Sequence, residues 1–258
     1  MKIPFVKMHA QGNDFIIVET DKTKIVDKLA SKLSIDICNR NFGLGADGLV
    51  LLNKINPQMI IFNADGSRAE MCGSALRCCC YLIAESSGKQ QIQIKTDNGI
   101  LKGVADKQNP LYVTVEIGKP VMIKNDIVLE GFTGDYITIG NPHFVILEHD
   151  LSLQPHLTHG KALSENKYFD HGSNIEFVHI ISKNKIEMVV WERGAGATMS
   201  CGTGSTAAVF SGQQKKLLDD KVQVHVPGGE VVISKKGNTY YLGGVVSLIA
   251  RGEFEWTI

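Results

Sequence analysis

Two cysteine-containing segments carry residue types and spacing that suit acid–base chemistry. Residues 72–74 read Cys-Gly-Ser and residues 201–203 read Cys-Gly-Thr, and each segment is followed by small or apolar residues typical of a buried helix. A thiol at a helix N-terminus lies near unpaired backbone N–H groups and the positive end of the helix dipole. This setting favours the thiolate and can bind a carboxylate.

Two such thiols suit a reaction in which one base removes a proton from a carbon and an acid on the opposite face returns one. Racemisation or epimerisation of an amino acid is that reaction. Because the α C–H bond is only weakly acidic, the carbanion needs electrostatic help, and backbone donors aimed at the substrate carboxylate supply it without a cofactor. We find no nucleotide-binding fingerprint or Walker motif, and we expect neither a cofactor nor a metal.

The elements that position these thiols are predicted from hydrophobic patterning. Lys24–Leu33 reads as an amphipathic helix, and Asp97-Asn98-Gly99 is a hairpin turn. We predict the strands at residues 3–8, 15–19, 49–52, 59–62, 91–96 and 100–104.

The second half of the chain repeats the order of the first. Gly12 and Gly140 begin similar segments 128 positions apart, and Cys72 and Cys201 are 129 positions apart. A constant offset near half the chain length predicts two copies of one α/β unit. We therefore expect two pseudo-symmetric lobes, residues 1–115 and 116–258, each with a mostly antiparallel sheet around a central helix. The final strand near 250–258 is expected to pack back on the first lobe, and the active site is expected in the cleft between the lobes.

Composition limits the classes of partner. The chain has 258 residues, 43% of them hydrophobic, and its 27 Lys and Arg balance its 27 Asp and Glu. This balance argues against nucleic acid or an anionic membrane as a partner. The six cysteines do not form a disulfide framework in a chain of this length, and with no apparent signal peptide they favour the cytoplasm.

Several longer motifs carry a resemblance to the diaminopimelate epimerase family. The chain is similar to that family over essentially its whole length, through residues 7–15, 41–49, 63–73, 140–145, 173–178, 191–208 and 226–231. The resemblance implies a cofactor-independent enzyme that interconverts LL- and meso-diaminopimelate in lysine and peptidoglycan-precursor synthesis. It also implies a small-molecule amino-acid substrate as the partner, with a homodimer as a possible assembly.

The resemblance also implies roles for individual residues. Cys72 and Cys201 become the two acid–base thiols. Glu192, which faces the substrate amino group, and His143, which assists electrostatically, are the other two catalytic residues. Arg193 suits a carboxylate because its guanidinium can bind both oxygens. The residues expected to bind substrate are Asn13, Asn63, Gly73, Ser74, Asn141, Asn174, Glu192, Arg193, Gly202 and Thr203.

The sequence departs from the usual family pattern near the reacting centre. Ser74-Ala75 replaces the usual Asn-Gly, Ala197 replaces a Glu, and Ala10-Gln11 replaces Gly-Leu in the first loop. Ser74 still provides a backbone N–H. The departures leave the reaction type intact but keep a related racemase with another substrate as an alternative. A thiol redox sensor and a non-catalytic carboxylate-binding module are the alternatives of a different class.

Other conspicuous residues have a structural interpretation. Cys78, Cys79 and Cys80 lie several residues into the predicted helix, and we expect them to pack in the core with no metal bound. Cys38 is expected to be structural as well. The histidine-containing stretch 149–172 is predicted to be a surface connection. His143 is open to a structural or a functional interpretation, and Glu192 with Arg193 could form a surface ion pair instead of a constrained loop.

Overall fold

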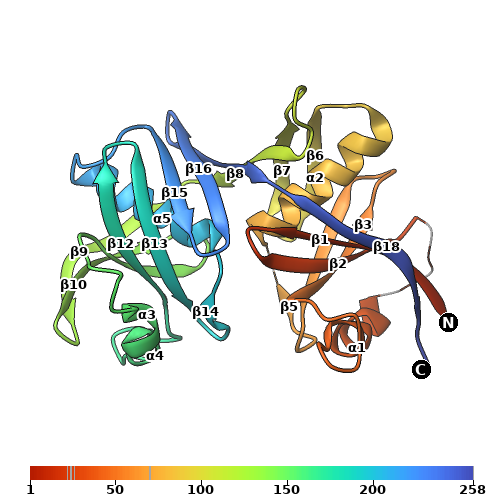
Figure 1. Cartoon of the computed structure of the whole chain (residues 1–258), viewed down its shortest axis with the longest axis horizontal. Helices are drawn as coiled ribbons and strands as arrows, with labels where there is room; N and C mark the ends of the chain where they lie inside the picture. The colour runs from red at the N-terminus through yellow and green to blue at the C-terminus, as the bar shows by residue number, and fades with distance from the viewer. Residues whose placement is uncertain (22, 24, 26, 70, 258) are drawn as a thin grey trace. The chain divides into compact units, whose positions relative to one another are not determined.

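The structure is a computed structural model that describes residues 1–257 except 22, 24, 26 and 70. The chain forms two compact units. The first unit comprises Met1–Val115 and Val245–Ile258, and the second comprises Glu116–Gly244 (Figure 1). None of the helices in the described part of the chain is both long and apolar enough to cross a membrane.

The first unit contains two helices of more than two turns, α1 (Asp27–Cys38) and α2 (Gly73–Ser87). Its strands are β1 (Lys2–Ala10), β2 (Asn13–Glu19), β3 (Gly48–Asn53), β4 (Gln58–Asn63), β5 (Arg68–Ala69), β6 (Gln91–Thr96), β7 (Gly99–Ala105), the first part of β8 (Tyr112–Gly118) and β18 (Ser247–Glu255).

The second unit contains α5 (Gly202–Gln214) and the short helices α3 (Pro155–Thr158) and α4 (Gly160–Ser164). Its strands are β9 (Val121–Leu129), β10 (Phe132–Thr138), β11 (Pro142–Ile146), β12 (Asn174–Ser182), β13 (Lys185–Glu192), β14 (Gly196–Thr198), β15 (Lys221–Val226), β16 (Gly229–Lys236) and β17 (Thr239–Val245), of which the last residue belongs to the first unit.

The two units repeat one pattern of strand pairing. In the first, β2 is parallel to β3 and β4 is parallel to β6, and α1 and α2 lie in the connections. In the second, β11 is parallel to β12 and β13 is parallel to β15, with α3 and α4 in one connection and α5 in the other. The antiparallel pairs β3–β4 and β6–β7 have β12–β13 and β15–β16 as counterparts. The predicted fold class, with two similar α/β units, is confirmed.

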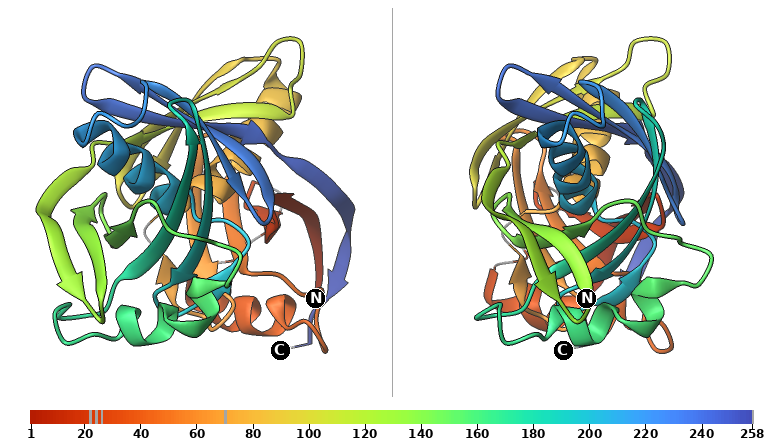
Figure 2. Two further views of the ribbon diagram at one scale, coloured as in Figure 1. Left: turned by 60° about the vertical axis from the view of Figure 1, so that its left-hand side comes forward. Right: turned by 90° about the vertical axis from the view of Figure 1, so that its left-hand side faces the viewer.

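In each unit a helix lies against the inner face of the sheet. Helix α2 packs on β1, β2, β6 and β7, and α5 packs on β10, β11, β12 and β16. Figure 2 shows α5 with strands of its own unit around it in the right-hand view. Both helices are rich in small or apolar buried residues, so strands can approach them from several sides.

Helix α1 differs from the prediction at its end. Two residues of the predicted helix, 24 and 26, lie outside the described residues. The helix continues to Cys38 instead of ending at Leu33, because Ile37 and Cys38 extend its buried face into the core with Leu33 and Leu49.

The C-terminal strand belongs to the first unit. β18 pairs antiparallel with β1, from Lys2 opposite Glu255 to His9 opposite Ser247. The Trp256 side chain is buried, and its indole N–H donates to Asp36 Oδ2 at 2.8 Å. This contact joins the end of the chain to α1 and stabilises the core of the first unit.

The stretch 149–172 is more ordered than a plain surface connection. It contains α3 and α4, and Leu163 and Phe169 are buried in a cluster with Phe144 and Phe177. The spacing of these few apolar residues is too irregular to predict short helices, so only packing on β11 and β12 reveals their role.

Candidate active site

Cys72 lies at the start of α2. It is the N-cap residue, with extended backbone angles (φ −143°, ψ 121°), and the two following residues, Gly73 and Ser74, are buried in the first turn. The Asn13 amide nitrogen Nδ2 lies 3.7 Å from the Cys72 sulfur, so an N–H donor from β2 faces the thiol. The predicted residues Cys72, Gly73, Ser74 and Asn13 are therefore brought together in the first unit.

Asn63 ends β4 in the same unit. Its side-chain amide donates to Ser67 Oγ at 2.9 Å, and its carbonyl oxygen accepts from Ser34 Oγ at 2.9 Å. The side chain is held at the turn that precedes β5 and α2. Its predicted contact with substrate stays a prediction.

Cys201 occupies the equivalent position in the second unit. It is the N-cap residue of α5 and is 5% exposed. The Gly204 backbone N–H donates to its sulfur at 3.3 Å, and Thr203 Oγ1 lies 3.4 Å from the same sulfur. The start of α5 therefore directs a backbone donor and a hydroxyl at the thiol.

A hydrogen-bonded chain extends from Thr203 into the sheet. Asn141 Nδ2 donates to Thr203 Oγ1 at 3.3 Å, and Asn141 Oδ1 lies 3.1 Å from His143 Nε2. His143 Nδ1 lies 2.7 Å from Glu176 Oε1. Each ring nitrogen thus faces an oxygen atom, one from the Asn141 amide and one from the Glu176 carboxylate. The structure makes His143 part of the Cys201 surroundings.

Glu176 is the site residue that the sequence analysis did not single out. Its side chain and that of His143 are both 0% exposed. A Cβ added at Gly204 would lie 2.5 Å from Glu176 Oε1, which shows how closely this carboxylate lies against the first turn of α5. A charged residue within the apolar run of β12 was the available sequence indication, because buried carboxylates are rare without a partner.

Glu192 lies next to Cys201 at the end of β13. Its carboxylate accepts from Thr198 Oγ1 at 2.5 Å and interacts electrostatically with the Cys201 thiol. Burial raises the pKa of the Glu192 carboxyl above its usual range, against the lowering effect of the neighbouring Thr198 hydroxyl and Cys201 thiol. Burial also raises the pKa of the Cys201 thiol well above its usual value, and the Glu192 and Glu176 carboxylates add to that shift. Cys201 is therefore a protonated thiol near neutral pH.

Glu192→Gln should make Cys201 more reactive. Removing a negative charge beside the sulfur favours the thiolate, so the pH midpoint for alkylation of Cys201 should fall, by about one unit. Peptide mass spectrometry after timed iodoacetamide treatment at several pH values measures it. Glu187→Gln, on the same strand, is the matched control and should leave the midpoint unchanged. An unchanged or higher midpoint in Glu192→Gln would contradict the inference that the Glu192 carboxylate disfavours the Cys201 thiolate.

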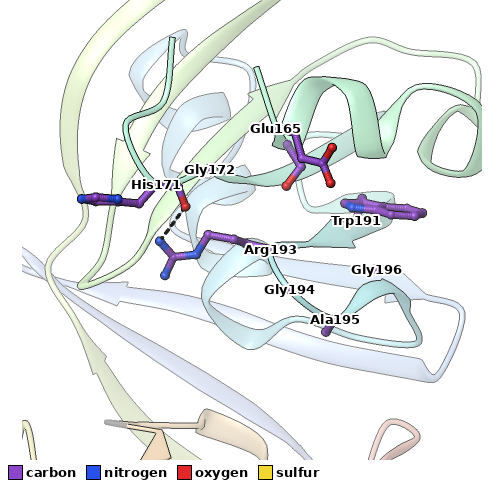
Figure 3. A pocket seen from close by; sticks show the side chains of 9 residues that line it. Glu165, His171, Gly172, Trp191, Arg193, Gly194, Ala195 and Gly196 are labelled. Carbon is purple, nitrogen blue, oxygen red and sulfur yellow. Dashed lines mark hydrogen bonds between the residues drawn. The ribbon is translucent and has the colours of Figure 1, made fainter. Parts of the chain in front are cut away.

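Arg193 lines a cavity of about 500 Å³ in the second unit (Figure 3). Glu165, His171, Trp191 and the loop Gly194–Gly196 line the same cavity. Arg193 Nη1 donates to the His171 carbonyl oxygen at 3.4 Å, and most of the guanidinium's donor positions are not used by this contact. This loop geometry replaces the alternative of a surface ion pair between Glu192 and Arg193, since Glu192 bonds to Thr198 and Arg193 to His171.

Asn174 holds the loop that carries Arg193. Its Nδ2 donates to the Pro142 carbonyl at 2.8 Å, and its Oδ1 accepts from the Arg193 backbone N–H at 3.0 Å. Asn174 is 4% exposed. Its side chain thus joins the start of β11 to the loop after β13, and its predicted contact with substrate stays a prediction.

The other cysteines are structural. Cys78, Cys79 and Cys80 are each 0% exposed, and burial raises the pKa of Cys78 and of Cys80 to about 12. Cys38 is 2% exposed. The expected core packing of these cysteines is confirmed. Within the described residues, His, Cys, Asp and Glu side chains do not gather in any group of three or more that could hold a metal ion.

The family model for diaminopimelate epimerase matches residues 5–123 and 136–248. The chain belongs to the diaminopimelate epimerase family. A diaminopimelate epimerase of Carboxydothermus hydrogenoformans is 37% identical, over 97% of this chain and 98% of that protein. One of Pelotomaculum thermopropionicum is 35% identical, over 98% of this chain and 99% of that protein. Membership of the family makes the chain an isomerase of the epimerase type.

A solved structure shares the fold of this family member at low sequence identity. A hydroxyproline epimerase from Agrobacterium vitis, solved with bound trans-4-hydroxy-L-proline, has a TM-score of 0.73 at 13% identity. The match covers 98% of this chain and 91% of that one. At this identity the likeness concerns the fold alone.

Proposed function

We propose that this chain interconverts LL- and meso-diaminopimelate by two-base proton transfer at one α carbon, without a cofactor. The observation that carries the proposal is that Cys72 and Cys201 cap the N-termini of α2 and α5, at equivalent places in the two units. Each thiol faces hydrogen-bond donors that suit a thiolate. Family membership supports diaminopimelate as the substrate.

The reaction balances with these groups alone. A thiolate takes the α proton, and the electron pair of the C–H bond stays on the carbon and its carboxylate. A thiol on the other face donates its proton to that carbon, and the two sulfurs exchange protonation states. Two-base chemistry therefore requires both sulfurs to reach one carbon. The protonated Cys201 suits the acid role and Cys72 the base role in the resting protein.

Carboxylate recognition divides between two kinds of donor. Backbone N–H groups at Gly73, Ser74, Gly202 and Thr203 suit the carboxylate at the reacting centre, where they would stabilise the charge that develops on it. Ser74 keeps its N–H despite departing from the usual Asn. The Arg193 guanidinium, in its cavity, suits the second carboxylate of diaminopimelate. Asn13, Asn63, Asn141 and Asn174 would complete the binding of substrate.

The cellular setting follows from the same proposal. The six cysteines are reduced thiols, which suits the cytoplasm. The product would feed lysine and peptidoglycan-precursor synthesis. A homodimer is the proposed assembly, and light scattering of the purified protein would test it.

Deuterium exchange tests the proposed function directly. Reduced protein in deuterium oxide should introduce deuterium at one α carbon of LL-diaminopimelate and yield the meso isomer, as followed by NMR. Single-centre amino acids, including proline and hydroxyproline, serve as comparison substrates and should exchange far more slowly. Exchange restricted to one of those amino acids would show that the substrate is not diaminopimelate. Ser74, Ala75 and Ala197, which depart from the family pattern, would then be the residues to examine for the changed specificity. No exchange with any substrate would reject the enzyme proposal.

A further inference from the structure

Arg77 is a buried cation in α2, one turn after the first residue of the helix. Its side chain is 0% exposed, and its Nε donates to the Gly73 carbonyl oxygen at 3.4 Å. The terminal nitrogens Nη1 and Nη2 are also buried, and neither has a hydrogen-bond partner among the described residues. Arginine keeps its proton in proteins, so this guanidinium places a positive charge inside the first unit. Burying such a charge without compensation is strongly unfavourable.

Among the described residues, the surroundings of Arg77 offer one group suited to compensate this charge. The first turn of α2 has no acidic residue. The inward-facing residues of β6 and β7 are uncharged, namely Ile92, Ile94, Thr96, Gly103 and Ala105. Charged residues of β1 and β2 bond elsewhere, Lys7 to the Gly45 carbonyl and Asp14 to Arg40, and His9 Nδ1 accepts from the Gly12 backbone N–H.

The titratable groups that interact electrostatically with Arg77 are Cys72, Cys78 and Tyr112. Burial raises the pKa of Cys78 to about 12 and also raises the pKa of Tyr112, so both are neutral near pH 7. Cys72 is half-buried at the helix start, where a thiolate is favoured. Among these three groups, Cys72 is the one suited to carry negative charge.

The equivalent helix in the second unit lacks this cation. The residue 129 positions after Arg77 is Thr206, and its hydroxyl donates to the Gly202 carbonyl at 2.8 Å, just as Arg77 Nε donates to Gly73. Around Cys201 the nearby charged groups are instead Glu192 and Glu176. Within the described part of the chain, a buried cation therefore lies near Cys72, whereas two carboxylates lie near Cys201.

We propose that Arg77 is a positioning residue that favours the Cys72 thiolate and so assigns the resting roles of the two thiols, Cys72 as base and Cys201 as acid. Its catalytic consequence rests on the proposed epimerase reaction. The effect of Arg77 on the ionisation of Cys72 does not rest on that reaction, because this ionisation can be measured without substrate.

Alkylation of Cys72 against pH is the test. In the wild-type protein, Cys72 should react with iodoacetamide with a midpoint below the ordinary thiol value of about 8.5. Arg77→Met should raise that midpoint by about 1–3 pH units. Arg77→Lys keeps the positive charge, so its midpoint for Cys72 alkylation should lie close to the wild-type value. Arg251→Met is the matched control, since Arg251 bonds to Glu85 at the far end of α2 and is exposed. Fragment mass spectra distinguish alkylation of Cys72 from alkylation of Cys78, Cys79 or Cys80.

The outcomes are decisive either way. A midpoint in Arg77→Met equal to that in Arg251→Met, in folded protein, would overturn the proposal, and so would an equal shift in Arg77→Lys and Arg77→Met. If the Arg77 variants do not fold, the wild-type profile decides, because a midpoint at or above about 8.5 contradicts a favoured thiolate. Failure here with intact diaminopimelate turnover would leave the proposed function standing. A shifted midpoint without turnover would reject only the function.

Discussion

Cys72→Ser and Cys201→Ser should each abolish nearly all interconversion of LL- and meso-diaminopimelate. A serine hydroxyl is a far weaker acid than a thiol, so neither half of the two-base exchange could use it near neutral pH. Loss of a positioned acid or base typically costs 10²–10⁴-fold, and we expect about 10³-fold or more in kcat for each variant. The Gly204 N–H and Asn13 amide would remain in place to bind a hydroxyl, so folding should be retained.

Product and exchange must be measured separately in these variants. NMR in deuterium oxide reports deuterium at the α carbon, and chiral separation reports inversion. Any residual exchange should occur without inversion, because one of the two faces has lost its proton donor or acceptor. Cys38→Ser, at a buried cysteine away from both helix starts, should keep turnover. Full interconversion by either Cys72→Ser or Cys201→Ser would exclude a two-thiol mechanism.

Glu176→Ala should destabilise the second unit strongly. Glu176 and His143 form a pair that is 0% exposed on both sides, with a distance of 2.7 Å between Oε1 and Nδ1. Removing one member leaves the other buried without its partner and creates a cavity between β12 and α5. Breaking a buried pair in this way costs about 3–5 kcal/mol in the free energy of unfolding. Chemical denaturation followed by Trp191 fluorescence, in a variant with Trp256 replaced by Phe, would monitor the second unit.

A surface pair provides the matched control. Glu230 Oε1 lies 3.8 Å from His225 Nδ1 in the same unit, and the two side chains are 49% and 51% exposed. Glu230→Ala should therefore change the free energy of unfolding by less than about 1 kcal/mol. If Glu176→Ala were no more destabilised than Glu230→Ala, Glu176 would not be the structural partner of His143. Turnover in Glu176→Ala should also fall, since His143 would no longer be oriented toward Asn141 and Thr203.

Local sequence was sufficient to predict both helix starts. Cys-Gly followed by small residues, repeated 129 positions later, predicts two thiol-capped helices, and α2 and α5 begin immediately after Cys72 and Cys201. The information is local, because turn formers, small residues and the N-cap position are defined within a few residues of each other. The repeat spacing likewise predicted two units with one pairing pattern, since each unit must build its own core.

The electrostatic identity of the two thiols was decided by tertiary structure. His143 and Glu176 are 33 positions apart, and they meet because β11 and β12 are parallel neighbours. Arg77 lies within a helix whose sequence gives no indication that its guanidinium is buried, with Nη1 and Nη2 unpartnered in the part of the chain that the structure describes. Charge effects depend on distance and burial, and both arise only when strands distant in sequence enclose a helix. The sequence therefore determined which residues could carry a proton, and the fold determined that a buried arginine lies near one thiol and two carboxylates lie near the other.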